Sequence, residues 1–321
     1  MPVLPVSVIE PLWAQFSALL PASPAVAPTH PLGRHRRRIS DRLVFDHVLA
    51  ALVHGSGYER IASPGCSDRT IRRRVRGWTD AGLMQDLHTL VLTQYDRMIG
   101  LELDDIAIDG CITKAPGGGA VAGKSPVDRG KQGLKRSVVV DGTGIPLGIV
   151  TAGANRHDSP LLASTLVSLA AWQAVPEETT VHLDAGYDSA PTRTLLAEHG
   201  YAAMIARKGV PAPIQVGTRW VVERTHAWMN GFGKLRRCTE TRRSVVEGYC
   251  LLAAVIVVIR CLIHRARSRY RWAARPTTRR LPRSLLPVAL TLRPMESRRP
   301  ARTPAGNWRA AARRRHRPCH R

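Results

Sequence analysis

Two aspartates stand at the ends of short apolar segments, in positions from which carboxylates can do chemistry. Asp109 closes the apolar run 106–108 and precedes Gly110, and Asp184 closes the run 181–183. In an open α/β sheet, the crevice outside the carboxyl ends of the strands is the usual ligand site. Two carboxylates there repel each other unless a cation lies between them, and Mg²⁺ prefers such oxygen ligands. The competing interpretation is that each aspartate only serves a turn.

A third acid, Glu223, lies in a segment with helical spacing. At about 100° per residue, one polar stripe collects Arg219, Glu223, His226 and Asn230. Such a helix could point Glu223 at the edge of the sheet, with Arg219 one turn earlier to hold a phosphate. On spacing alone, an ordinary surface ion pair between Arg219 and Glu223 explains the pattern equally well.

Five further aspartates compete for these roles. Asp188 is the strongest rival to Asp184, whereas Asp158 suits the cap of a following helix. The other three are Asp104, Asp105, which is deeper along its strand, and Asp141, which opens a hairpin turn. The choice among them depends on which side chains the fold brings together.

The segments that contain the three acids resemble those of a known family. The segments Ala107-Ile108-Asp109-Gly110, Leu183-Asp184-Ala185-Gly186-Tyr187-Asp188-Ser189 and Arg219-Trp220-Val221-Val222-Glu223-Arg224-Thr225 are similar to the three acidic motifs of DDE transposases from bacterial insertion sequences. The insertion sequence 5 family is the closest. Two further segments are similar to segments of this family at the same places, namely Asp128-Arg129-Gly130-Lys131 with Lys135-Arg136, and Asn155-Arg156-His157-Asp158-Ser159. The resemblance extends from about residue 36 to residue 272.

The resemblance implies a ribonuclease H-like α/β fold, with a mixed sheet flanked by helices, preceded by an all-α helix-turn-helix domain. It also implies that Asp109, Asp184 and Glu223 are the catalytic residues and bind two Mg²⁺ ions, for which Mn²⁺ can substitute. The implied activity is binding of the ends of an insertion sequence, followed by DNA strand cleavage and strand transfer. Two alternatives stay open, a metal-dependent nuclease that cuts without joining and a catalytically decayed DNA-binding remnant.

The implied partners are double-stranded DNA, as terminal inverted repeats and target DNA, and a second copy of the chain in a homodimer on DNA. The implied location is the bacterial cytoplasm, at the nucleoid and away from membranes. The six cysteines show no C-x-x-C pair, which fits free thiols in a reducing compartment. The longest apolar run, 251–259, is cut by Arg260 and is too short to span a bilayer, so a buried helix is expected.

The sequence departs from the family pattern around Glu223. The family places a Tyr three residues before the Arg of this motif and a Lys seven residues after the Glu. This chain has Val216 and Asn230 at those positions. Lys234 is the candidate to supply the missing positive charge to a DNA phosphate.

Helical spacing dominates the first hundred residues. An amphipathic segment at 8–20 is followed by a helix that Ser40 or Asp41 can cap and that ends near Gly55. A short helix at 58–62 and a basic helix that Ser67 or Asp68 can cap complete a helix-turn-helix outline, with the basic helix in the recognition position. A solvated charged helix in a bundle would show the same pattern.

From about residue 101 the period becomes that of strands. Short β-like runs occupy 105–109, 137–140, 147–152, 181–184 and 201–206, and helical segments occupy 159–172, 219–229 and 244–264. This order favours a mixed sheet with helices on its faces. We expect four segments, namely an N-terminal helix with a basic linker (1–38), a helix-turn-helix DNA-binding domain (39–98), a catalytic domain (101–270) and an Arg- and Pro-rich disordered tail (271–321).

The charge of the chain favours a nucleic-acid partner. Its 48 Lys and Arg residues exceed its 24 Asp and Glu residues, which gives a formal charge of +24. Residues 265–321 hold 18 of the Arg residues and one acid, Glu296, so the rest of the chain is only near +7. The basic residues expected to contact DNA are Arg69, Arg72, Arg73, Arg76, Lys124, Arg129, Lys131, Lys135, Arg136, Arg219 and Lys234.

Overall fold

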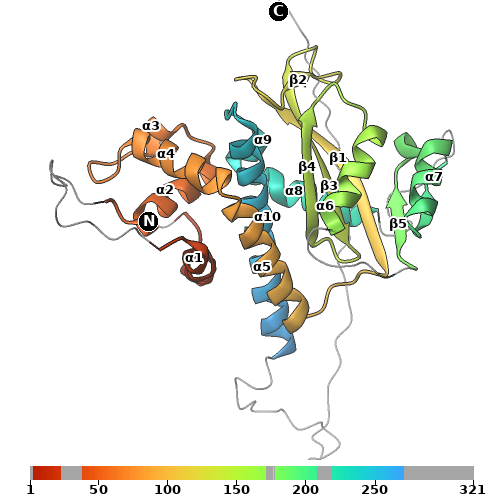
Figure 1. Cartoon of the computed structure of the whole chain (residues 1–321), viewed down its shortest axis with the longest axis horizontal. Coiled ribbons are helices and arrows are strands. Elements are labelled where there is room, and N and C mark those ends of the chain that lie inside the picture. Colours follow the sequence, from red (N-terminus) through yellow and green to blue (C-terminus); the bar gives the residue numbers. More distant parts are fainter. Residues whose placement is uncertain (1–2, 23–37, 171–175, 177, 208–218, 271–321) are drawn as a thin grey trace, which may run out of the picture. The chain divides into compact units, whose positions relative to one another are not determined.

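The computed structural model describes residues 3–22, 38–170, 176, 178–207 and 219–270 (Figure 1). The described residues all belong to one compact unit. The expected disordered tail, Val216 and most of the expected basic linker lie outside the described residues.

Helices make up the N-terminal part of this unit. They are α1 (Val6–Leu19), α2 (Asp41–His54), α3 (Tyr58–Ile61), α4 (Asp68–Asp80) and α5 (Leu83–Met98). Ser40 and Ser67 cap α2 and α4 by accepting hydrogen bonds from backbone N–H groups three residues later, as predicted. The helices α2, α3 and α4 give the expected helix-turn-helix order.

Aromatic side chains hold the N-terminal helices together. The Phe16 ring of α1 stacks on the Phe45 ring of α2, with centroids 4.6 Å apart. Trp78 of α4 meets the Phe16 ring edge-on at 5.0 Å. These contacts bury the apolar face of α4, and its arginines are therefore directed away from this core.

A mixed sheet forms the second part of the unit. Its strands are β1 (Asp105–Lys114), β2 (Gly123–Lys124), β3 (Gln132–Asp141), β4 (Pro146–Gly153), β5 (Thr180–Leu183) and β6 (Ala202–Ile205). β3 pairs antiparallel with β1, β2 and β4, whereas β5 runs parallel to both β1 and β6. This strand arrangement is ribonuclease H-like, as the resemblance implied.

Helices cover both faces of the sheet. They are α6 (Leu162–Ala170), α7 (Ala190–Glu198), α8 (Trp220–Asn230), α9 (Gly233–Arg236) and α10 (Arg243–Arg269). On β4, Gly148 faces Ser168 of α6, whereas the Thr151 hydroxyl donates to Glu247 of α10 at 2.9 Å. Residues three apart on a strand point to opposite faces, so α6 and α10 cover opposite sides of β4.

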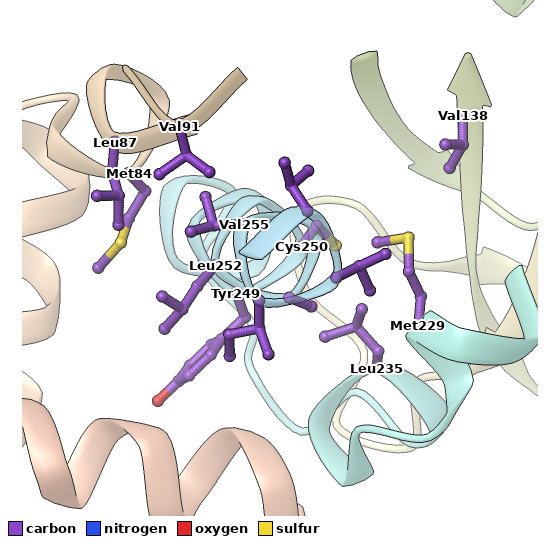
Figure 2. Packing of buried hydrophobic residues seen from close by; sticks show 14 of the residues in the cluster. Met84, Leu87, Val91, Val138, Met229, Leu235, Tyr249, Cys250, Leu252 and Val255 are labelled. Carbon is purple, nitrogen blue, oxygen red and sulfur yellow. The ribbon is translucent and has the colours of Figure 1, made fainter. Parts of the chain in front are cut away.

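The longest helix, α10, runs through the core of the unit. Figure 2 shows it between Met84, Leu87 and Val91 of α5 on one side and Val138, Met229 and Leu235 on the other. Its 27 residues extend beyond the predicted 244–264, and an 18-residue window has a mean hydropathy of 2.3, high enough to cross a membrane by length and composition alone. Burial of 67% of that window accounts for this hydropathy, as in the core helix of a soluble protein.

A glycine lets α10 approach the helix-turn-helix closely. A Cβ on Gly248 of α10 would collide with the side chain of Thr79 in α4. Next to this contact, Ser244 donates to Asp80 at 2.9 Å and Arg242 pairs with the same carboxylate at 2.9 Å. The basic helix is therefore braced directly against the core helix.

Candidate active site

Asp109 lies in the middle of β1 rather than at its end. The strand continues to Lys114, and Asp109 lies opposite Val138 of β3. Its Oδ1 accepts a hydrogen bond from the Gly110 N–H at 2.7 Å, and 27% of its side chain is exposed. The expectation that Asp109 closes a strand is therefore wrong, although the side chain still reaches the surface of the sheet.

Asp184 follows β5 directly and comes beside Asp109 through the strand register. The parallel ladder between β1 and β5 ends with Ala107 opposite His182. Continuing that register by two residues sets Asp109 beside Asp184. Asp184 Oδ1 accepts a hydrogen bond from the Gly186 N–H at 3.0 Å, which fixes the carboxylate at the start of the following turn.

Glu223 projects from α8, which packs against β1 and β3. Three residues later on the same side of the helix, His226 places its Nε2 3.3 Å from the Asp109 carbonyl oxygen and 3.9 Å from Asp109 Oδ2. The exposed Glu223 side chain therefore lies on the edge of α8 that borders Asp109.

The pKa of Asp109 reflects the charges of the neighbouring acids. Burial, together with the smaller effect of the negative charges of Asp184, Asp158 and Glu223, raises the pKa of Asp109 from 3.8 to about 7. The hydrogen bond from Gly110 opposes this shift. Beside it, burial and the charge of Arg136 lower the pKa of His226 to about 3, so this imidazole is neutral.

Asp158 is a fourth carboxylate at this site, which sequence reasoning assigned to helix capping. Its side chain makes no cap hydrogen bond. It pairs instead with Lys135 Nζ at 2.8 Å, and its Oδ1 is buried without a hydrogen-bond partner among the described residues. A Cβ at Gly110 would collide with this carboxylate, so the glycine after Asp109 makes room for it.

Three of the other rival aspartates are engaged elsewhere. Asp188 accepts from Arg193 at 2.7 Å, and Asp105 pairs with His182 at 2.6 Å. Asp141 is buried in the hairpin between β3 and β4, where it accepts from the Ile145 N–H at 2.8 Å. None of these three is among the charges that shift the pKa of Asp109.

The carboxylate oxygens suit a hard divalent cation, and their mutual repulsion is what such an ion would relieve. In the described ranges, no three His, Cys, Asp or Glu side chains lie close enough together to hold a metal ion. The carboxylates therefore fit a metal ion by their chemistry and charge, but in this structure their side chains are farther from one another than metal ligands would be.

Three basic residues expected at DNA are buried. Lys135 and Arg136 lie within β3 rather than in a loop, with 5% and 0% of each residue exposed. Arg136 hydrogen-bonds to Asn230. Lys234 is 3% exposed and pairs with Glu240 at 2.6 Å. These positions do not fit direct contact with a DNA backbone, because each charge is enclosed by the protein.

The remaining basic residues lie in two exposed regions and at the start of α8. Lys124, Arg129 and Lys131 are exposed on β2 and the loop before β3. Arg219 is half-buried just before α8. On α4, the exposed side chains are Arg69, Arg73 and Arg76.

Arg72 of α4 differs from its neighbours because it has acidic partners. It pairs with Glu59 and lies 3.6 Å from Asp68. Among the residues that the structure describes, Arg69, Arg73 and Arg76 have no acidic partner. Arg74, which was not assigned to DNA, pairs with Asp41.

Comparison with known sequences identifies the family of the chain. The family model described as "Transposase DDE domain" matches residues 101–210, and a model for transposases of the IS4/5 family matches residues 8–88. A protein described as a transposase for insertion sequence element IS402 of Burkholderia cepacia is 31% identical over 141 residues, which cover 42% of this chain and 67% of that protein. A 16.2 kDa protein of the same element is 29% identical over 119 residues, 36% of this chain and 79% of that protein.

Solved structures of transposase complexes are remotely similar. The Mos1 strand transfer complex is 15% identical to this chain. The match covers 74% of this chain and 78% of the Mos1 chain, with a TM-score of 0.30. The Mos1 mariner paired end complex with Mn is 11% identical to this chain. The match covers 82% of this chain and 84% of the Mos1 chain, with a TM-score of 0.30. The family matches and the IS402 relative carry the conclusion, and the chain belongs to the DDE transposases of bacterial insertion sequences.

Proposed function

We propose that Asp109, Asp184 and Glu223 are the metal-binding catalytic carboxylates of this transposase. The observation that supports this most directly is the raised pKa of Asp109, to which the charges of Asp184 and Glu223 contribute. A divalent cation between the acids would turn this repulsion into attraction. Mg²⁺ suits an all-oxygen donor set, and Mn²⁺ can take the same ligands. Binding requires the side chains to close in from their present separation.

Held by Asp109, Asp184 and Glu223, two such ions would supply activation of the attacking water or 3′-OH and stabilisation of the leaving oxygen in an in-line displacement at phosphorus. The chain itself contributes the positions of the acids. The Gly110 N–H holds Asp109 on β1, and the Gly186 N–H holds Asp184 after β5. Glu223 is exposed on α8 and keeps the freedom to turn toward them. We propose Asp109 as the ligand shared by both ions.

We propose that residues 39–98 bind the terminal inverted repeats and that residues 101–270 carry out the chemistry. Arg69, Arg73 and Arg76 of α4 are exposed and unpaired within the described part of the chain, which suits contacts to phosphates and base edges. Lys124, Arg129 and Lys131 suit the backbone of the bound end or of target DNA. A homodimer on DNA, acting in the bacterial cytoplasm at the nucleoid, completes the proposal.

The test pairs Asp184→Asn with Asp188→Asn as a matched control. The substrate is a duplex carrying the element's ends, offered with target DNA and Mg²⁺. We expect Asp184→Asn to abolish strand cleavage while its affinity for the end duplex stays unchanged, and Asp188→Asn to keep cleavage. Cleavage retained by Asp184→Asn would refute the assignment. An enzyme that cuts but never joins ends to target would be a nuclease instead.

A further inference from the structure

A basic groove lies between α8 and α10, on a different side of α8 from Glu223. Its volume is about 830 Å³, and its lining includes Arg224, Trp228, Arg260, His264 and Arg265. No acidic side chain lines it in the part of the chain that the structure describes. Three guanidinium groups around one cavity favour an anionic occupant.

Two tryptophan rings with an arginine between them border this groove, and we call this row of side chains on α8 the Trp220 ladder. Trp220, Arg224 and Trp228 succeed one another at four-residue intervals and so share one face of α8. The Arg224 guanidinium lies 4.3 Å from the ring centroid of Trp220 and 4.8 Å from that of Trp228. Both rings remain solvent-accessible, at 43% and 37% of each residue.

Three polar side chains of the groove differ in their hydrogen bonding and exposure. The Arg224 Nε is buried without a hydrogen-bond partner among the described residues, although its Nη2 donates to the Thr143 carbonyl. Arg260 and His264 are exposed on the adjoining face of α10. The groove therefore presents charge and aromatic surface together.

The size and chemistry of the groove select its occupant. Cavities of this volume take ligands of drug size, which corresponds to a few nucleotides, and they do not admit a whole duplex. Exposed aromatic rings beside arginines bind unpaired bases by stacking while the charges bind the backbone. The Arg-rich segment that follows residue 270 carries the same sign of charge and is a poor match.

We infer that the groove between α8 and α10 binds unpaired nucleotides of a DNA strand, as a site separate from both the carboxylates and α4. The inference extends the proposed function, because α8 would contact the DNA strand on one side and carry Glu223 on another. At about 100° per residue, the Trp220 ladder and Glu223 lie on neighbouring faces of the same helix. A strand released at the cut end would then be held next to the acids.

Binding measurements on the full chain test the inference. The probes are a short fluorescein-labelled oligothymidylate and a labelled blunt duplex of equal length. Binding of each probe to the protein is measured by fluorescence anisotropy in EDTA. The variants are Trp228→Ala and Arg260→Gln, and the matched control is Arg267→Gln, which removes the same charge from an exposed position of α10 outside the groove.

We expect Trp228→Ala to weaken binding of the single strand by about fivefold or more, the usual effect of losing one stacking ring. Arg260→Gln should weaken it too and reduce the slope of log affinity against log salt by about 0.7. Duplex affinity and the Arg267→Gln control should stay as in the wild type. Unchanged single-strand affinity in Arg260→Gln, or an equal loss for the duplex or for the control, would overturn the inference.

These outcomes are independent of the catalytic assignment, because binding is measured without metal. If Trp228→Ala loses its circular dichroism signal, Arg260→Gln, on the surface of α10, decides the matter alone. Failure of the carboxylate assignment would instead appear as cleavage by Asp184→Asn with single-strand binding intact.

Discussion

Replacing Asp109 by Asn should stabilise the metal-free protein at pH values above about 4, and most strongly above neutral pH. Burial and the charges of Asp184, Asp158 and Glu223 raise the pKa of Asp109 from 3.8 to about 7. At pH values between 3.8 and about 7, residue 109 has lost its carboxyl proton in the unfolded chain but keeps it in the folded chain. The free energy of unfolding of the wild type therefore falls as the pH rises through this window. Asn keeps an acceptor for the Gly110 N–H but cannot ionise.

The magnitude follows from the size of the pKa shift. One pKa unit corresponds to about 1.4 kcal/mol, so Asp109→Asn gains up to ~4 kcal/mol at about pH 8 and ~1.6 kcal/mol at about pH 5. The gain vanishes below the pKa of the unfolded chain. Because 27% of the Asp109 side chain is exposed, these values are upper limits.

Urea denaturation in EDTA at both pH values measures this difference. Asp104→Asn, at an exposed position of the same region, controls for the loss of a charge. We expect the advantage of Asp109→Asn to grow by up to ~3 kcal/mol between the two pH values, and that of the control to stay constant. Added Mg²⁺ should stabilise the wild type more than the variant at the higher pH. Parallel pH profiles for wild type and Asp109→Asn would refute the reasoning.

Three further substitutions probe other parts of the molecule. Phe45→Ala should lower the free energy of unfolding by about 3–5 kcal/mol, measured in urea, because the ring is fully buried against Phe16; a loss below ~1 kcal/mol would contradict this packing. Lys234→Met should cost about 3–5 kcal/mol because it leaves the Glu240 carboxylate without its buried partner. Its affinity for end duplex, measured by gel shift under native conditions, should be unchanged, and a loss would restore a DNA role. Arg73→Gln should weaken binding to end duplex and reduce the salt slope by about 0.9, and an unchanged slope would exclude a phosphate contact.

The local elements could be predicted because their signals lie close together in the sequence. Ser40 and Ser67 cap helices within three residues, and the hairpin after Asp141 depends on its own turn. Helix α5 escaped notice because its 16 residues follow α4 after only Ala81 and Gly82, so the pattern lacked a clear break. Its partner α10 is distant in the sequence, and packing between them decides where both helices extend.

The position of Asp109 within β1 could not be predicted, because the reason for Gly110 is tertiary. A glycine after an aspartate is typical of a turn, yet here it makes room for the carboxylate of Asp158. The same holds for Asp158 itself, whose partner Lys135 lies 23 residues away in the sequence. The site therefore contains a fourth acid and a lysine that local patterns assigned to other roles.

Charged residues in β3 and α9 show the second limit of sequence reasoning. Lys135, Arg136 and Lys234 belong to a residue class that is almost always exposed, which made DNA contact the natural expectation. Lys135 and Lys234 can be enclosed because Asp158 and Glu240 accept hydrogen bonds from their ammonium groups, and the Asn230 amide oxygen accepts one from Arg136. Only the three-dimensional pairing reveals these partners.

The close contact between α10 and α4 at Gly248 fixes the distance between α4 and the carboxylates within the transposase. Because α10 packs against α4 and also against α8 and β4, the helix proposed to read DNA and the acids proposed to cut it belong to one compact unit. The interval along the DNA between the bases read and the phosphate attacked is then set by the protein. Inserting base pairs between the recognised sequence and the terminus should move the cut by the same number, leaving it inside the element.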